Sequence, residues 1–377
     1  MKLMHISDLH LGKVLCGYPL LEDQQHILNC MLAIAEEQKP DAILIAGDVF
    51  DRSAPAAEAV VLLDDFLTRL SAGQTPILMI AGNHDSPERI AYGGRIMERN
   101  QIYLSPVYDK NGTIRTVTLS DAHGEVCFWL MPFLHPSDVR LAFPDKKIAN
   151  TNEALRTVIE AMDPDPSVRH VLVAHQFVTG ASLSDSEETY CGTAEQVSSE
   201  LFAPFEYTAL GHLHNPQNVG SARVRYCGTP LKYSASEANS EKSVTFVELG
   251  EKGSEPVITE IPLRPMRDLR KLRGSFAELI QGSSNEYVHI LLTDETDIPD
   301  ANGKLRMRYP YLLGMEYERK ASYNPDALAD LQKEPEKDPQ ELFTAFFEQM
   351  MSFKMSEAQE TLMQELIKEI WEKGEDV

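Results

Sequence analysis

The chain has few basic residues for its size. Lys and Arg together number 35 against 58 Asp and Glu, which gives a formal net charge of −23 over 377 residues. A surface with this charge repels polyanions. The composition therefore excludes a protein that holds nucleic acid on a generally basic surface, and any such contact must overcome this repulsion.

Other class-defining features are also absent. The five cysteines (Cys16, Cys30, Cys127, Cys191 and Cys227) are scattered and form no CxxC pair, which is typical of reduced thiols in a cytosol. No run of about 18 apolar residues occurs and no apolar signal segment follows the first residues, so we expect a soluble, cytoplasmic protein. There is no GxxxxGK[ST] phosphate loop, so if ATP is needed, another chain binds it.

Up to about Leu263 the sequence alternates short β-like and helical segments, which predicts an α/β core. The apolar spacing predicts helices over Leu20–Gln38 and Glu58–Leu70. Three β-like segments, Arg223–Cys227, Ser243–Leu249 and Val257–Ile261, follow one another without helices. They predict a meander that closes the second half of the core, in a mixed sheet or a sandwich of two sheets.

The composition changes at "PLRPMRDLRKLRG" (Pro262 to Gly274), which indicates a domain boundary. A short helix over Phe276–Ile280 and strands over Tyr287–Thr293 and Tyr311–Tyr317 predict a small α+β domain. Two further helices are indicated by N-terminal capping residues, Asp338 with Pro339 and Glu341, and Ser356 with Gln359. We therefore expect a core over residues 1–263, a small domain over 264–323, a linker over 324–337 and a helical tail over 338–377.

Five β-like segments end in Asp, Asn or His, residue types that often bind metal ions. They read "LMHISDLHLG", "AILIAGDVFDR", "IAGNHDSPE", "HVLVAHQ" and "YTALGHLHNP". Because the carboxyl ends of strands in an α/β sheet converge on one edge, these residues should gather in one crevice. The set is too large for one ordinary ion and predicts a binuclear site. Its members are Asp8, His10, Asp48, Asn83, His175, His212 and His214.

The remaining histidines lack this context at a strand end, so we expect structural or exposed roles for them. They are His5, His26, His123, His135, His170 and His289. Asp51 and Arg52 are expected in a salt-bridged loop, with substrate contact as the alternative. The acidic run "SDSEE" (Ser184 to Glu188) is expected to be a solvated loop.

In their order and spacing, "SDLH", "GDVFD", "GNHD", the single His and "GHLH" resemble the five motifs of the calcineurin-like metallophosphoesterases. The resemblance implies a β-sandwich flanked by helices, with two divalent ions, in that family manganese. It implies that Asp48 bridges the ions, that His84 is the catalytic acid or base and that Asp85 orients it. It assigns one ion to Asp8, His10 and His214, and the other to Asn83, His175 and His212.

The segments after the core resemble those of bacterial nuclease subunits that work with an SMC-like ATPase. This resemblance implies a metal-dependent exonuclease and endonuclease of DNA repair, with a DNA-capping domain. It also implies a homodimer within a heterotetramer and a tail that binds the ATPase. Two basic clusters could flank the metals or be solvated, one in 264–273 and one at Lys304, Arg306 and Arg308. The alternatives are a stand-alone phosphodiesterase or phosphatase for a small metabolite, and a non-catalytic scaffold.

Overall fold

The structure is a computed structural model that describes residues 1–182, 196–318, 340, 343, 344, 347 and 355–374. It divides into two compact units. The first unit comprises residues 1–272, 280–290 and 302–315, and the second comprises the described residues among 273–279, 291–301 and 316–377. All the side chains of the predicted metal site belong to the first unit.

The first unit contains two six-stranded sheets. In the first sheet the strand order is β14-β13-β1-β4-β5-β6. The neighbours β1, β4, β5 and β6 pair in parallel, whereas β13 pairs antiparallel with both β1 and β14. Its strands are β1 (Lys2–Ile6), β4 (Ala42–Ala46), β5 (Ile77–Ile80), β6 (Ile102–Ser105), β13 (Ser243–Glu248) and β14 (Val257–Pro262).

The second sheet has a similar plan, with four parallel strands and an antiparallel strand at each edge. Its order is β11-β12-β10-β9-β8-β7. Its strands are β7 (Arg115–Asp121), β8 (Gly124–Leu130), β9 (Arg169–His175), β10 (Tyr207–Gly211), β11 (Gln217–Val219) and β12 (Ser221–Tyr226).

The apolar residues of the central strands alternate between two cores, as the period of two in a strand requires. In β4, Leu44 packs into a core shared by both sheets, whereas Ile43 and Ile45 pack into the core under the helices. Phe128 of β8 and Val173 of β9 belong to the shared core. The two sheets therefore form a sandwich with buried residues on both faces, which confirms the second of the two predicted sheet arrangements.

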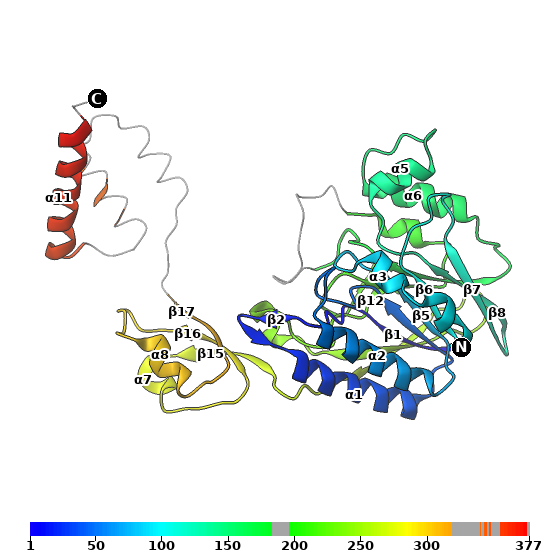
Figure 1. Cartoon of the computed structure of the whole chain (residues 1–377), viewed down its shortest axis with the longest axis horizontal. Helices are drawn as coiled ribbons and strands as arrows, with labels where there is room; N and C mark the ends of the chain where they lie inside the picture. Colours follow the sequence, from blue (N-terminus) through cyan, green and yellow to red (C-terminus); the bar gives the residue numbers. More distant parts are fainter. Residues whose placement is uncertain (183–195, 319–339, 341–342, 345–346, 348–354, 375–377) are drawn as a thin grey trace. The chain divides into compact units, whose positions relative to one another are not determined.

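Two pairs of helices cover the outer faces of the sandwich (Figure 1). Helices α1 (Leu21–Gln38) and α2 (Ala57–Ser71) contribute Ile27, Met31 and Phe66 to the core on the first sheet. Helix α6 (Thr151–Met162), next to α5 (Pro136–Ala142), contributes Leu155 and Val158 to the core on the second sheet. The two helices predicted from apolar spacing are confirmed to within one residue at each end.

The first unit also contains short elements. They are the hairpin β2 (Val14–Leu15) and β3 (Tyr18–Pro19), helices α3 (Pro87–Ala91) and α4 (Gly94–Met97), and the 3₁₀ turns η1 (Glu98–Asn100), η3 (Ser199–Phe202) and η4 (Ala235–Asn239).

The predicted meander of three strands is wrong. Strand β12 pairs with β10 and β11 in the second sheet, whereas β13 and β14 extend the first sheet beside β1. Between them, residues 227–242 cross from one sheet to the other and include η4. The alternation pattern shows that each segment is a strand, but it does not identify the neighbour with which the strand pairs.

Part of the segment read as a domain boundary is itself a strand. Leu269–Gly274 forms β15, in a three-stranded sheet of order β15-β16-β17 with β16 (Tyr287–Leu292) and β17 (Leu312–Tyr317). Leu269 is buried, whereas the charged residues Arg270 and Lys271 that follow it are exposed. Helices α7 (Phe276–Leu279) and α8 (Ala301–Arg306) accompany these strands.

In the tail, helix α11 spans Glu357–Gly374. The backbone N–H of Gln359 donates to Ser356 Oγ at 3.4 Å, and that of Ser356 donates to Gln359 Oε1 at 2.9 Å. This reciprocal pair is the predicted capping box. The other predicted cap, at Asp338, Pro339 and Glu341, lies outside the described residues, as do the acidic loop at 184–188 and Cys191. Among the helices described, none combines the length and the apolar character needed to span a bilayer.

The two sheets approach closely at the carboxyl ends of β4, β9 and β10. A Cβ added at Gly211 would overlap the carbonyl oxygen of Ala46 and lie 2.7 Å from His175 Nδ1. Only glycine allows backbones to come this close.

We predict that Gly211→Ala lowers the free energy of unfolding by about 1–3 kcal/mol, because the added methyl group forces the sheets apart. Chemical denaturation measures it, with Gly73→Ala as the control, since the nearest atoms to a Cβ at Gly73 lie 3.8 Å away. Equal stability of the two variants would contradict the prediction.

Candidate metal centre

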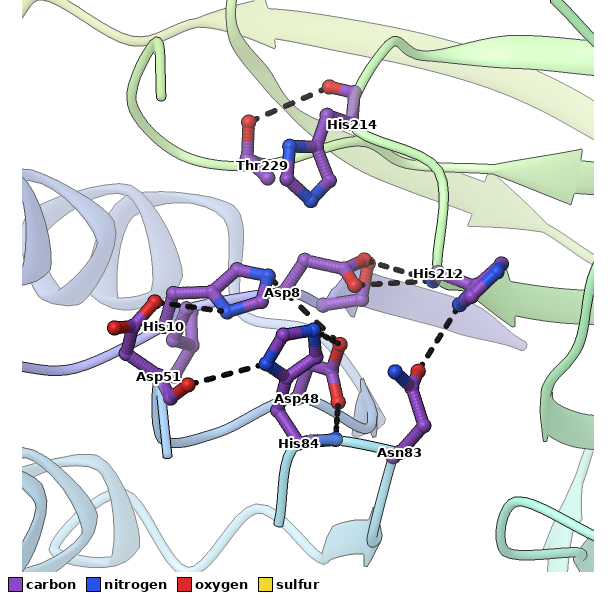
Figure 2. A network of polar contacts seen from close by, with 12 residues as sticks. Asp8, His10, Asp48, Asp51, Asn83, His84, His212, His214 and Thr229 are labelled. Atoms are coloured by element: carbon purple, nitrogen blue, oxygen red, sulfur yellow. Dashed lines mark hydrogen bonds and ion pairs between the residues drawn. The ribbon is translucent and has the colours of Figure 1, made fainter. Parts of the chain in front are cut away.

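All seven predicted ligand residues lie at one edge of the sandwich, in loops or at strand ends of both sheets. Asp8, Asp48 and Asn83 follow β1, β4 and β5 of the first sheet, and His175 and His212 end or follow β9 and β10 of the second. Figure 2 shows that Asp8, His10, Asp48, Asn83, His84, His212 and His214 surround one small region. The edge-of-sheet argument therefore holds, with the difference that two sheets contribute.

The backbone at this edge has unusual dihedral angles. Asp8, His10, Asp48 and His212 have positive φ angles of 52°, 44°, 49° and 106°. Such conformations cost about 1–3 kcal/mol each in residues other than glycine and persist only where the surroundings enforce them. Here the backbone N–H groups of Asp8 and His10 donate to Gly47 O and Asp48 O, both at 3.0 Å, which ties the first two loops together.

One group of candidate ligands contains Asp8, His10 and His214, whose ligand atoms lie within 4.8 Å of one another. All three side chains are buried. Asp8 is fixed from the second sheet, because the backbone N–H of His212 donates to its two carboxylate oxygens at 3.0 and 3.2 Å.

A second group forms around the amide oxygen of Asn83. This Oδ1 atom lies 3.0 Å from His175 Nε2 and 3.0 Å from His212 Nδ1. His175 Nδ1 donates to the carbonyl oxygen of Ala46 at 2.8 Å, which directs Nε2 toward Asn83.

Asp48 lies between the two groups. Its Oδ2 atom is 3.8 Å from His10 Nε2 and 3.3 Å from His175 Nε2. A carboxylate in contact with both groups can bind an ion in each.

The donor set fits divalent cations. Both ring nitrogens of His10 are buried and have no hydrogen-bond partner among the described residues, although the side chain is only 1% exposed. Leaving buried nitrogens without a partner costs free energy, and a bound cation would provide one. Imidazole, carboxylate and amide oxygen donors suit ions such as manganese, iron and zinc.

The protonation states support the same conclusion. Burial lowers the pKa of His10 well below its ordinary value, and burial, reinforced by the neighbouring His175, lowers the pKa of His212 to about 3. Burial raises the pKa of Asp8 to about 6. Burial alone would lower the pKa of His175, but Asp48 raises it to about 9. Without a metal ion, a proton on His175 therefore balances the negative charge of Asp48.

His84 faces the same region from the loop after β5. Its ring is 4.9 Å from that of His10, and its backbone N–H donates to Asp48 Oδ1 at 2.9 Å. Its Nδ1 atom is 3.1 Å from the carbonyl oxygen of Asp51. Because a carbonyl can only accept, Nδ1 carries the hydrogen and Nε2 faces the site.

The predicted role of Asp85 in orienting His84 needs correction. The carboxylate of Asp85 accepts hydrogen bonds from the backbone N–H groups of Val49, Phe50 and Gly82, at 3.1, 2.9 and 2.9 Å. It therefore connects the loops after β4 and β5, while Asp51 O contacts the His84 ring. The family resemblance implied a pair of side chains, whereas the partners of the Asp85 carboxylate are backbone N–H groups.

The salt-bridged loop expected at Asp51 and Arg52 is present. Asp51 Oδ1 is 2.8 Å from Lys13 Nζ and 3.7 Å from His10 Nδ1, and Asp51 Oδ2 is 3.7 Å from Arg52 Nε. Asp51 thus lies near the candidate ligand His10 without a hydrogen bond to its ring. Among the other histidines, buried His5 contacts Tyr207 Oη at 2.8 Å, and His170 accepts from Trp129 Nε1 at 3.0 Å, as expected for structural residues.

The sequence did not predict the residues that contact His214 and the loop after β1 from behind. Glu237 Oε1 lies 3.6 Å from His214 Nδ1, and Lys242 Nζ donates to His214 O at 2.7 Å. Tyr233 Oη donates to Leu9 O at 2.6 Å. These residues lie in the crossing segment 227–242, which no pattern in the sequence connects to the ligands.

Most arginines of the first predicted basic cluster are paired nearby. Arg267 is 2.6 Å from Glu22 and 2.7 Å from Asp23. Arg270 is 2.7 Å from Glu286, and within the second unit Arg273 is 2.6 Å from Glu318. These contacts favour local structural roles over a surface of unpaired cations.

We predict that metal binding depends on pH. A metal ion must displace the proton from His175 below about pH 9 and also that from Asp8 below about pH 6, so the affinity for Mn²⁺ rises with pH over this range. The change should reach about tenfold per pH unit for each displaced proton. Titration calorimetry between about pH 5.5 and 8, in two buffers of different ionisation enthalpy, measures the affinity and the protons released. Constant affinity without proton release would contradict the prediction.

The chain is similar to known protein families and to a known protein. Residues 1–216 match the Calcineurin-like phosphoesterase family, and residues 265–351 match the Type 5 capsule protein repressor C-terminal domain. The chain is 36% identical over 324 residues to a subunit of the nuclease SbcCD from Staphylococcus epidermidis, covering 84% of this chain and 85% of that protein.

Two solved structures are weakly similar. The protein TT1561 of Thermus thermophilus has a TM-score of 0.39 at 13% identity, and a dimetal phosphatase from Danio rerio has 0.42 at 10% identity. Each similarity covers 69% of this chain and 98% of the other. The family matches and the 36% identity confirm the resemblance predicted from the five motifs: the chain belongs to the calcineurin-like phosphoesterase family.

Proposed function

We propose that this protein is a metal-dependent nuclease that hydrolyses DNA phosphodiesters in the cytoplasm, as an exonuclease on double strands and an endonuclease on single strands and hairpins, in DNA repair and recombination. The observation that carries the proposal is the convergence of seven candidate ligands and His84 on one edge of the sandwich. The relative named as part of a nuclease supports DNA as the substrate, because its similarity extends over 84% of the chain. A stand-alone metabolite phosphatase or a scaffold has no comparable support.

The candidate ligands divide between two ions. Asp8, His10 and His214 would hold one ion, Asn83, His175 and His212 the other, and Asp48 would contact both, with manganese as the proposed metal. When bound, such a pair of cations supplies an activated water and neutralises charge on the phosphate.

His84 would act on the leaving group. With Nδ1 donating to Asp51 O, its Nε2 atom is directed to the region between the ligands. A protonated Nε2 can donate to a phosphoryl oxygen or to the departing alkoxide. Asp85 contributes indirectly, by holding the loop that carries both Asn83 and His84.

We further propose that residues 264–323 form a DNA-capping domain and that the tail binds an SbcC-like SMC ATPase, with two copies of each chain in the complex. In α11, Leu362 is 57% exposed and Leu366 is 44% exposed. Residues four apart lie on the same face of a helix, so these leucines provide apolar anchors for a partner helix.

We predict that His84→Gln retains the bound metal but loses about 10²–10⁴-fold of the hydrolysis rate, the usual contribution of an acid or base group. Asp48→Asn should instead lose both metal and activity. Metal content by elemental analysis and hydrolysis of duplex DNA are measured on the same samples. Loss of metal from His84→Gln would identify His84 as a ligand, and unchanged hydrolysis in Asp48→Asn would refute the two-ion assignment.

We predict that a chain ending at Lys337 stays folded and hydrolyses bis-p-nitrophenyl phosphate at the rate of the full chain, but no longer captures the SbcC-like ATPase. The full chain carrying Leu362→Asp and Leu366→Asp should lose capture as well, because the exposed anchors become charged. Pull-down with the purified ATPase and a hydrolysis assay test both variants. Equal capture by all forms would show that the docking surface lies elsewhere.

A further inference from the structure

We propose that Glu237 is a positioning residue that, together with Lys242, orients His214 as a metal ligand. The inference rests on the proposed metal-binding function of His214. It concerns the crossing segment 227–242, which contributes none of the predicted ligands.

The carboxylate of Glu237 is fully buried behind His214. Glu237 is 0% exposed and its Oε1 atom lies 3.6 Å from His214 Nδ1. The same oxygen accepts from the backbone N–H of Tyr233 at 3.3 Å, which fixes it in place. A carboxylate on one ring nitrogen of a histidine selects the tautomer and leaves the other nitrogen, Nε2, for a metal ion.

The main chain of His214 is held by the same cluster. Its carbonyl oxygen accepts from Lys242 Nζ at 2.7 Å and from the backbone N–H of Thr229 at 3.0 Å, and Figure 2 shows Thr229 beside it. Lys242 Nζ is also 2.5 Å from Glu237 Oε2. One buried ion pair therefore holds the backbone of His214 and places a carboxylate beside its ring.

Fold stability alone does not explain this arrangement. Burying a carboxylate and an ammonium removes them from water, and a buried ion pair often contributes no more than apolar residues of equal volume. A role in orienting a ligand does explain it, since residues behind metal-binding histidines typically change metal affinity about 10–100-fold.

The test compares Mn²⁺ binding by the full chain and by Glu237→Gln, which keeps the volume but removes the charge. We expect the affinity of one ion to fall about 10–100-fold by titration calorimetry, and the rise in melting temperature on adding Mn²⁺ to shrink accordingly. If Glu237→Gln fails to fold because Lys242 is left unpaired, the double variant Glu237→Gln with Lys242→Met removes both charges and gives the same readout.

The matched control is Glu206→Gln. Glu206 is also buried, is 2.9 Å from Lys252 and accepts from the backbone N–H of a histidine, His170, at 2.7 Å, but neither partner is a candidate ligand. Three results would overturn the proposal. They are wild-type Mn²⁺ affinity in the folded Glu237 variants, an equal loss of Mn²⁺ affinity in the Glu206→Gln control, and no Mn²⁺ binding by the unmodified chain. Tight Mn²⁺ binding by a chain that hydrolyses no DNA would instead refute the nuclease function, and the comparison of variants would still decide the role of Glu237.

Discussion

The candidate centre depends on one hydrogen bond between the two sheets, from His175 Nδ1 to the carbonyl oxygen of Ala46. It joins the last residue of β9 to the last residue of β4, and it fits only because Gly211 has no side chain. Through this contact His175 Nε2 is directed at Asn83 and Asp48, which belong to the opposite sheet. The position of the ligands relative to one another therefore follows from how closely the sheets pack.

Charge balance is the second requirement of this buried region. Asp8 and Asp48 lie side by side with almost no access to water, and burial without compensation would disfavour both carboxylates. In the absence of a cation, His175 and the backbone N–H groups of His84 and His212 provide the compensation. A bound cation would replace the proton on His175 as the source of positive charge beside Asp48.

The grouping of the candidate ligands could be predicted from the sequence, because each ligand lies beside a strand whose apolar pattern is clear. Asn83 and His212 could be grouped because each follows the carboxyl end of a strand, although their strands, β5 and β10, belong to different sheets. The path of residues 227–242 could not be predicted, because no local pattern shows that the chain leaves one sheet for the other. Glu237 was missed for this reason, and Asp85 was misassigned because its partners are backbone groups.

The contribution of both sheets to the ligands has a consequence for folding kinetics. Asp8 and His214 are 206 positions apart in the chain, so the complete ligand set exists only after long-range strand pairing is finished, which is a slow and late step. A metal ion bound only by the finished structure stabilises the native state and not the transition state. It therefore lengthens the lifetime of the folded protein by slowing unfolding, while the rate of folding stays unchanged.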